Sequence, residues 1–202
     1  MYRRKDAFYT RAKTAGYRSR AAFKLIELVD RHRLLRRGDR VVELGAWPGG
    51  WLQVAAHYVG REGCVVGVDV VPIEPLPGAS VVTVVGDIED PDTRRRVAAA
   101  CGGPADVLLS DLAPKLTGVR VRDQARSAAL TDCVLMYANE ILRPGGTLIV
   151  KLFTSSDLAG YIARLRARFG EVRTTRPEAT RKGSAELYAI ALNFRGPDST
   201  LP

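Results

Sequence analysis

Short runs of apolar residues recur along the chain after residue 40, and each is rich in Val, Leu or Ile. Nearly continuous runs of this length are typical of strands that are covered on both faces of a parallel sheet. We therefore expect strands at residues 40–45, 64–69, 80–86, 105–111 and 146–152.

The segments between these runs have helical patterning. Helices are expected at residues 49–59, 91–101, 123–143 and 156–169, and Gly145 and Gly146, which follow Pro144, are expected to end the third of them. Strands that alternate with helices predict an α/β protein with a doubly wound, Rossmann-like, mostly parallel sheet.

The two ends of the chain depart from this alternation. Residues 171–176 and 185–194 both read as strands, and the turn region between them is too short for a helix, so a C-terminal antiparallel hairpin should complete a seven-stranded sheet. Near the other end, residues 19–30 predict a helix with Ser19 as its N-cap. Its apolar stripe would consist of Ala22, Leu25, Ile26 and Val29.

The totals describe one globular domain. The chain has 202 residues, 46% hydrophobic and 26% charged, and no apolar run reaches the roughly 20 residues of a membrane span. We expect a basic flexible N-terminal segment at 1–18, a single domain at 19–196 and a C-terminal tail at 197–202. The charged N-terminus lacks the apolar region of a secretory signal. Asp6 and the early start of a patterned segment weaken the alternative of a mitochondrial presequence, so we expect a cytoplasmic protein.

The cysteines and histidines show no metal-ligand or disulfide spacing. Cys64, Cys101 and Cys133 are far apart and odd in number, and His32 and His57 stand alone. We expect no metal site, and buried thiols at Cys64 and Cys133.

Positive charge is concentrated in the first fifth of the chain. The net charge is +9; residues 1–40 hold 13 Lys/Arg against 4 Asp/Glu, and the rest of the chain holds 18 of each. Such a block favours a polyanionic partner over a merely solvated face. Aromatic residues are interleaved with these charges. They could stack on unpaired RNA bases, or they could anchor this segment to the core, and anchoring is the role expected of Phe23. The candidate phosphate contacts are Arg3, Arg4, Lys5, Arg11, Lys13, Arg18, Arg20, Arg31, Arg33, Arg36 and Arg37, extended by Arg173, Arg176, Arg181 and Lys182.

The stretch VVELGAWPGGW at residues 41–51 follows the first predicted strand with a glycine turn. In open α/β sheets ligands bind beyond the carboxyl ends of the strands, which makes Gly45, Gly49 and Gly50 candidate cofactor contacts. Trp47 occupies the position where a dinucleotide fingerprint needs its second glycine, and no Walker lysine follows. The turn therefore favours S-adenosylmethionine, which has no pyrophosphate. A purely structural strand-to-helix turn is the alternative.

Three aspartates stand at successive strand ends. Asp69, Asp87 and Asp111 close the second, third and fourth predicted strands. Carboxylates in these places can accept hydrogen bonds from ribose hydroxyls and the adenine edge. Their common register supports a cofactor that contains adenosine.

The chain resembles the FtsJ/RrmJ family of RNA ribose 2′-O-methyltransferases, in particular its bacterial-type enzyme for large-subunit ribosomal RNA. The matching pieces run in order along nearly the whole chain: YRSRAAFKL at 17–25, VELGAWPGGW at 42–51, VVGD at 84–87, SDLAP at 110–114, VKLF at 150–153, RPEATR at 176–181 and SAELY at 184–188.

The resemblance implies a cofactor, a catalytic set and a partner. The cofactor is S-adenosylmethionine, with contacts at Gly49, Trp51, Asp69, Asp87 and Asp111. A Lys-Asp-Lys-Glu tetrad falls on Lys24, Asp111, Lys151 and Glu186. The implied activity is methylation of a ribose, expected to be a uridine, in ribosomal RNA of the large subunit or a late precursor. We expect a monomer. The alternatives are a transfer-RNA or mRNA-cap ribose methyltransferase and a non-catalytic RNA-binding protein on the same fold.

Three residues depart from the family pattern. Glu43 stands where an aspartate is common, Trp47 replaces a small residue in the glycine turn, and Lys115 follows DLAP where asparagine is commoner. None of them removes a member of the tetrad. The change at Trp47 affects the expected shape of the pocket around the methionine part of the cofactor.

The chemistry of ribose methylation fits these residue types. A 2′-hydroxyl is a poor nucleophile, and a lysine whose pKa is lowered by burial and a neighbouring cation can remove its proton. We expect Lys151 to be this base, with Lys24 and Glu186 orienting it and the ribose, and Asp111 holding it. The alternative is a strand-end lysine that only reaches toward water.

Overall fold

The structure is a computed structural model, and it describes residues 7–76, 80–113, 120–154, 158–181 and 183–197. Lys115, Lys182 and the basic residues Arg3, Arg4 and Lys5 lie outside the described part of the chain.

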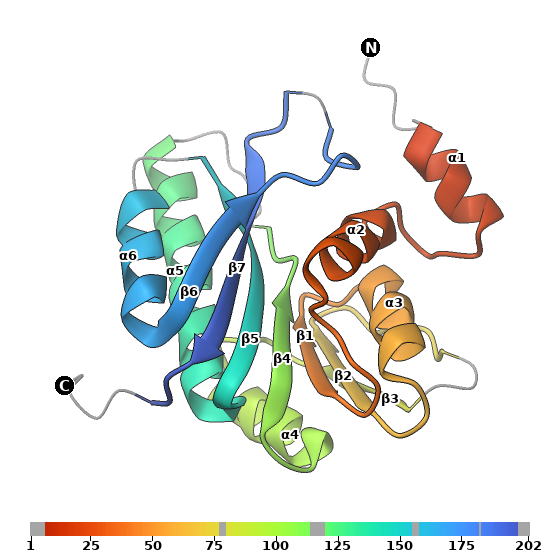
Figure 1. Cartoon of the computed structure of the whole chain (residues 1–202), viewed down its shortest axis with the longest axis horizontal. Coiled ribbons are helices and arrows are strands. Elements are labelled where there is room, and N and C mark those ends of the chain that lie inside the picture. Colours follow the sequence, from red (N-terminus) through yellow and green to blue (C-terminus); the bar gives the residue numbers. More distant parts are fainter. Residues whose placement is uncertain (1–6, 77–79, 114–119, 155–157, 182, 198–202) are drawn as a thin grey trace.

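One seven-stranded sheet organises the chain (Figure 1), with the strand order β3-β2-β1-β4-β5-β7-β6. Strands β1 to β5 are parallel to one another, whereas β7 runs antiparallel to both β5 and β6. The strands are β1 (Arg40–Leu44), β2 (Cys64–Asp69), β3 (Val81–Val85), β4 (Ala105–Ser110), β5 (Leu142–Phe153), β6 (Phe169–Thr175) and β7 (Glu186–Phe194). The expected mostly parallel sheet with an antiparallel C-terminal pair is confirmed.

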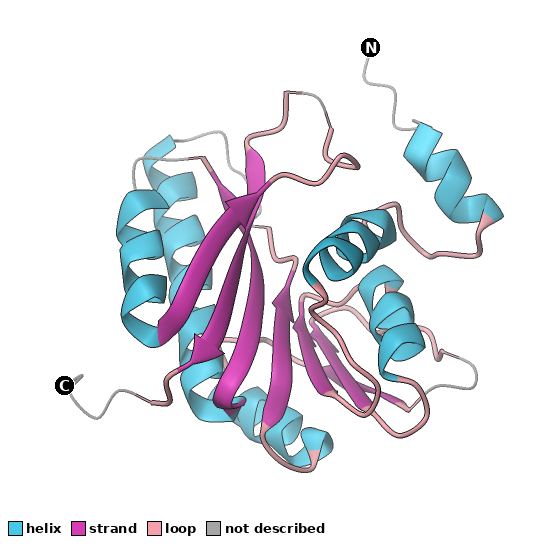
Figure 2. Cartoon of the chain, viewed as in Figure 1, coloured by secondary structure: helices cyan, strands magenta, loops and turns pink. Residues whose placement is uncertain are grey.

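Helices cover both faces of the sheet (Figure 2), so the chain forms three layers. Their bounds are α1 (Ala7–Thr14), α2 (Ala22–His32), α3 (Gly50–Val59), α4 (Pro91–Cys101), α5 (Arg120–Ile141) and α6 (Leu158–Arg168). Neighbouring residues of one strand point to opposite faces. Val41 therefore packs in the core beneath α2 and α3, and Val42 packs in the core beneath α4, α5 and α6.

The third long helix and the strand after it meet earlier than expected. Helix α5 ends at Ile141, and β5 begins at Leu142 instead of residue 146. Ala105 of β4 pairs with Leu142, but Val107 pairs with Thr147, so β5 bulges around its Pro-Gly-Gly sequence. The proline and glycines thus shape the start of a strand instead of ending a helix.

The N-terminal region contains a helix that the sequence analysis did not predict. In α1, Phe8 lies 6.0 Å from the Phe23 ring of α2, and the Arg11 guanidinium lies 4.6 Å above that ring. Phe23 thus contacts the N-terminal segment, as expected of an anchor. Ser19 is not an N-cap: α2 begins at Ala22, and its capping residue makes no side-chain hydrogen bond.

The predicted stripe of α2 is largely buried. Ala22, Leu25 and Val29 lie in the core, Leu28 joins them, and Ile26 is partly buried. No helix in the described part of the chain is long and apolar enough to cross a membrane. Burial raises the pKa of the Cys101 and Cys133 thiols to about 11, so both stay protonated.

Candidate active site

The predicted catalytic residues meet at the edge of the sheet where the parallel strands end. Asp111 follows the last residue of β4, and Lys151 lies near the end of β5. Because β7 is antiparallel to β5, its first residue, Glu186, lies at this same edge and pairs with Phe153. Helix α2 brings Lys24 to the edge from the layer above the sheet.

Two lysine–carboxylate pairs form there. The Lys24 ammonium contacts the Glu186 carboxylate in a short ion pair, and both side chains are largely buried. Lys151 Nζ lies 3.0 Å from Asp111 Oδ1 and donates to the Asp111 backbone carbonyl at 2.6 Å. The Lys151 side chain is 8% exposed and that of Asp111 is 19% exposed. Both ion pairs are therefore largely buried but keep some contact with solvent.

Tyr188 joins the two pairs, and the sequence analysis did not identify it as a site residue. Its hydroxyl donates to Asp111 Oδ1 at 2.7 Å, and Lys24 Nζ lies 3.5 Å from the Tyr188 hydroxyl oxygen. Burial, with the negative charges of Asp111 and Glu186, raises the pKa of Tyr188 well above its usual value. The phenol therefore keeps its proton and acts as a permanent donor.

A sequence signal for Tyr188 existed. Tyr188 follows Glu186 by two residues within a strand, so the two side chains share a face of the sheet. Tyr188 also pairs directly with Lys151 across the β5–β7 ladder. We refer to Lys24, Asp111, Lys151, Glu186 and Tyr188 as the lysine–carboxylate cluster.

Helix α2 also holds the loop that leads to Glu186. Arg20, just before the helix, donates to the carbonyl of Ala179, and the Glu27 carboxylate accepts from the backbone N–H of Glu178 at 2.7 Å. Lys24 lies between Arg20 and Glu27 on successive turns. The β6–β7 loop is thus fastened on both sides of the lysine that pairs with Glu186.

The glycine turn, residues 45–50, links β1 to α3 at the same edge. Gly45 and Gly49 have φ values of +77° and +104°, which side chains other than glycine rarely adopt. A Cβ at Gly45 would lie 2.6 Å from the Leu112 side chain. The turn therefore needs glycine both for its backbone conformation and for the close approach of the segment after β4.

Arg18 anchors the segment before α2 to this turn. Its guanidinium donates to the carbonyls of Pro48, Glu74 and Pro75 at 3.3, 2.5 and 2.7 Å. This position gives Arg18 a structural role in the protein, and its expected contact with phosphate stays a prediction.

The aspartates at the strand ends hold the loops of this edge. Asp69 accepts from the backbone N–H of Trp47 and of Val71, each at 2.9 Å. Asp87, which is exposed, accepts from the N–H of Glu89 at 2.9 Å. Trp47 is 57% exposed beside Asp69, so its ring is available to a ligand. Asp69, Asp87 and Asp111 thus lie at one edge of the sheet.

Gly50 and Trp51 serve the packing of α2 on α3. A Cβ at Gly50 would overlap the Ser19 hydroxyl. The Trp51 ring is 2% exposed and lies 5.8 Å from the Tyr188 ring, and its indole N–H donates to the carbonyl of Ala21 at 2.8 Å. Trp51 therefore supports the site from within the core, whereas the sequence analysis treated it as a cofactor contact.

Glu43 provides a test of whether the edge suits a cationic cofactor. It lies in β1 between β2, which ends in Asp69, and β4, which Asp111 follows. Its Oε2 atom is buried and has no hydrogen-bond partner in the part of the chain that the structure describes. Burial, with the charges of Asp111 and Asp69, raises its pKa well above the usual value. A positively charged group beside these three carboxyls would remove their mutual repulsion. S-adenosylmethionine carries two such groups, a sulfonium and an ammonium, and the residues fit it.

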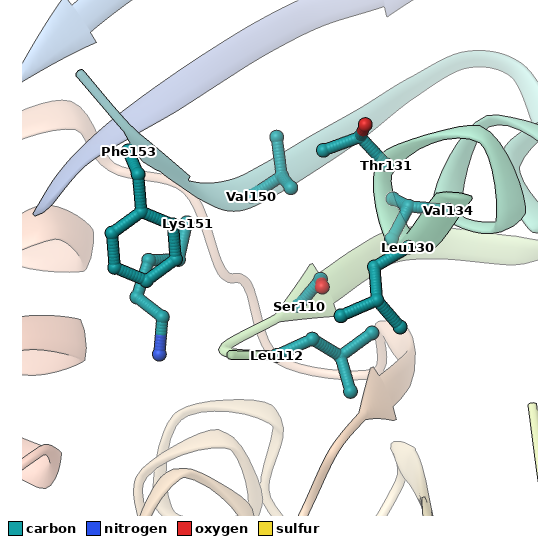
Figure 3. Close-up of a pocket in the computed structure, with 8 residues that line it drawn as sticks. All are labelled: Ser110, Leu112, Leu130, Thr131, Val134, Val150, Lys151 and Phe153. Carbon is teal, nitrogen blue, oxygen red and sulfur yellow. The ribbon is translucent and has the colours of Figure 1, made fainter. Parts of the chain in front are cut away.

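A small cavity lies on the other side of Lys151 from the cluster. It is lined by Ser110, Leu112, Leu130, Thr131, Val134, Val150, Lys151 and Phe153 (Figure 3). Its volume of about 10 Å³ is at the lower limit for one water molecule. Figure 3 shows the Lys151 ammonium pointing away from this cavity. The cavity is too small for a cofactor.

The remaining basic candidates fall into two groups. Arg20, Arg31, Arg173 and Arg176 have partners within the protein, namely the Ala179 carbonyl, Glu27, Glu171 and the Ser184 carbonyl. Among the candidates, the exposed side chains that make neither an ion pair nor a cation–π contact within the described residues are Lys13, Arg33, Arg36 and Arg37, whereas Arg11 lies over the Phe23 ring. These four are the better candidates for phosphate contacts.

The sheet order, the glycine turn and the acidic strand ends together define the fold of the S-adenosylmethionine-dependent methyltransferases. The FtsJ-like methyltransferase family model matches residues 17–194. The chain belongs to this family, and S-adenosylmethionine is its cofactor.

Curated relatives match along nearly the whole chain. The chain is 48% identical over 186 residues to the "Ribosomal RNA large subunit methyltransferase E" of Methanothrix thermoacetophila, covering 92% of this chain and 71% of that protein. It is 42% identical over 194 residues to the protein of the same name from Methanothermobacter thermautotrophicus, covering 96% and 92%.

Solved structures share the fold. The crystal structure of a Plasmodium falciparum protein, described as a ribosomal RNA methyltransferase, matches with a TM-score of 0.78 and 28% identity, covering 89% of this chain and all of that one. Aeropyrum pernix fibrillarin, solved with natively bound S-adenosyl-L-methionine, matches with a TM-score of 0.60 and 18% identity, covering 87% and 75%.

Proposed function

We propose that the protein methylates the 2′-hydroxyl of a ribose, in a uridine, within large-subunit ribosomal RNA. The observation that carries this proposal is the cluster in which Tyr188 joins the Lys24–Glu186 and Lys151–Asp111 pairs beside the glycine turn. The relatives named for ribosomal RNA large subunit methyltransferase E support the substrate. We propose a cytoplasmic monomer that acts on the large subunit or a late precursor.

The proposed cofactor residues divide into two groups. The glycine turn, Glu43 and Asp69 would hold the methionine and ribose parts, and Asp87 would lie toward the adenine. S-adenosylmethionine supplies an electrophilic methyl group on its sulfonium and retains the electron pair of the broken carbon–sulfur bond. Asp111 contacts Lys151 and would also lie near the bound sulfonium, so its carboxylate would favour positive charge on either side.

Lys151 acts as the general base in this proposal. Its neutral amine accepts the proton of the 2′-hydroxyl while the oxygen forms its bond to the methyl carbon. The ammonium that results is stabilised by Asp111, which lies 3.0 Å from Nζ. Lys24, which pairs with Glu186 and lies 3.5 Å from the Tyr188 hydroxyl, is assigned to orienting the ribose.

The remaining cluster residues orient the reactants. Glu186 fixes Lys24, and Tyr188 fixes the Asp111 carboxylate that holds Lys151. Holding nucleophile and donor in line can contribute roughly 7–11 kcal/mol to lowering the barrier. The two ion pairs supply this order.

Transfer of a labelled methyl group, followed by nucleoside analysis, tests the proposed function. Large subunits, total transfer RNA and capped messenger RNA from unmethylated sources are incubated with the protein and labelled cofactor. We expect 2′-O-methyluridine from the large subunits, and loss of transfer when the target carries a 2′-deoxyribose. Label in transfer RNA or caps alone would favour another substrate, and RNA binding without label would indicate a non-catalytic protein.

A further inference from the structure

A second hollow lies on the outer side of α3, away from the lysine–carboxylate cluster. Its volume is about 460 Å³, within the range of roughly 300–1,000 Å³ found for small-molecule sites. The α1–α2 linker and α3 line it together with the segment before β3. The lining residues are Ala15, Gly16, Tyr17, Gln53, Ala56, His57, Gly60, Arg61, Leu76 and Ser80. We call this hollow the α3 groove.

The walls of the α3 groove are fixed by hydrogen bonds. Gln53 accepts from the backbone N–H of Arg18 at 2.8 Å and donates to the carbonyl of Gly16 at 2.9 Å, which clips the linker to α3. On the opposite rim the Ser80 hydroxyl donates to the carbonyl of Arg61 at 3.3 Å. The groove is therefore preorganised, which lowers the cost of ordering a bound ligand.

The side chains that remain available in the groove suit an anion with an aromatic ring. Arg61 and His57 are exposed, and Arg61 makes no ion pair with the described residues. Tyr17 and His57 provide aromatic surface, and no acidic side chain is among the groove residues that the structure describes. The Arg37 guanidinium lies 3.7 Å from the Cβ position of Gly60, which adds positive charge at one end.

The groove is connected to the cofactor edge through Arg18. The backbone N–H of Arg18 binds Gln53 in the groove wall, and its guanidinium lies 3.1 Å from the Cβ position of Gly49 in the glycine turn. The groove thus opens on one side of the linker and the glycine turn lies on the other. The linker belongs to the basic first 40 residues, for which the sequence analysis expects a polyanionic partner.

We propose that the α3 groove binds an unpaired nucleotide of the RNA substrate, away from the ribose that is methylated. Arg61 would contact its phosphate, and Tyr17 and His57 would contact its base. Aromatic contacts of this kind recognise splayed-out bases in RNA, and phosphate contacts set its register. This inference rests on the proposed function, because it assumes an RNA substrate.

Affinity for a single-stranded RNA, measured over a range of salt, tests the inference. Arg61→Glu is compared with Arg166→Glu, which makes the same charge change at an exposed position of α6 on the other face of the sheet. We expect Arg61→Glu to weaken binding about tenfold more than Arg166→Glu. We also expect its salt slope to fall by about 0.7, the contribution of one phosphate on a single strand. His57→Ala should weaken binding without changing that slope.

Two further readings separate this inference from the proposed function. Cofactor affinity should be unchanged in all three variants, because none of the three residues lies in the glycine turn or the cluster. Equal RNA affinities for Arg61→Glu and Arg166→Glu would contradict the proposal that the α3 groove binds RNA, even if the wild-type protein methylates ribosomal RNA normally. If the wild-type protein transfers no methyl group to RNA, the proposed function fails, whatever the groove binds.

Discussion

The lysine–carboxylate cluster and the glycine turn lie at the same edge of the sheet, but they are built by different means. The cluster consists of side chains from α2, β5, β7 and the end of β4, and each charged member is paired with another. The turn is a local backbone structure that depends on positive φ values at Gly45 and Gly49. Changes in the cluster should therefore affect the rate of transfer, and changes in the turn should affect cofactor affinity.

Replacing Lys151 should have the largest effect. Removing a general base typically costs about 10²–10⁴-fold in rate, so we expect Lys151→Ala to lower single-turnover methyl transfer at least this much. Calorimetry should show unchanged cofactor affinity, because Lys151 is not part of the glycine turn and its ammonium contacts Asp111. A loss of cofactor affinity as large as the loss of rate would contradict the division between the two regions.

A side chain in the glycine turn should give the opposite result. At Gly49 an alanine Cβ would meet Arg18 at 3.1 Å, and the left-handed conformation itself costs alanine about 1–2 kcal/mol. We expect Gly49→Ala to weaken cofactor binding about tenfold and to leave the rate at saturating cofactor nearly unchanged. Gly38→Ala is the matched control, because its φ is +82° and its Cβ would meet nothing within 4 Å.

Removing the Tyr188 hydroxyl should have an intermediate effect on the cluster. Hydrogen bonds to charged groups contribute about 1.5–3 kcal/mol, and Tyr188→Phe removes one from Asp111. We expect the rate to fall about tenfold with unchanged cofactor affinity, and denaturant unfolding to show reduced stability. The buried Tyr161 hydroxyl has no hydrogen-bond partner among the described residues, so Tyr161→Phe should leave both nearly unchanged.

Glu43 should give the smallest effect, visible as a pH dependence of stability. The folded protein binds the Glu43 proton more tightly than the unfolded chain, because burial raises the pKa of this carboxyl. Its contribution is therefore fully present below the unfolded pKa of about 4.3 and is lost as the pH rises toward the folded pKa.

Glu43→Gln removes this titration from β1. Without cofactor, we expect the variant to gain free energy of unfolding relative to the wild type as the pH rises above about 4.3. Urea unfolding at a series of pH values measures this difference. A difference that is constant with pH would show that Glu43 ionises equally easily in the folded and unfolded protein.

The sequence predicted the sheet well because its strands are buried on both faces and appear as apolar runs. It predicted less well where tertiary contacts decide the structure. Helix α1 has only Ala12 buried, so it lacks a clear apolar stripe. Ser19 looked like an N-cap, but its side chain packs against Gly50 of another helix.

The candidate site shows the same limit. Motifs identified the four charged members of the cluster. The spacing from Glu186 places Tyr188 on the same sheet face, but its pairing with Lys151 across β5 and β7 is seen only in the structure. The sequence also could not show that the Trp51 ring is buried in the core, because this depends on the packing of α3 against the segment that contains Ala21. Motifs identify residues with suitable chemistry, and strand register then determines which of them meet.

The pH dependence of single-turnover methyl transfer at saturating cofactor and RNA tests the central claim most directly. If Lys151 must be neutral to accept the 2′-hydroxyl proton, the logarithm of the rate rises with a slope near one and reaches a plateau once the amine is deprotonated. The residual rate of Lys151→Ala should lack this rise. A wild-type rate that does not change with pH, or the same rise in Lys151→Ala, would contradict the assignment of Lys151 as the base.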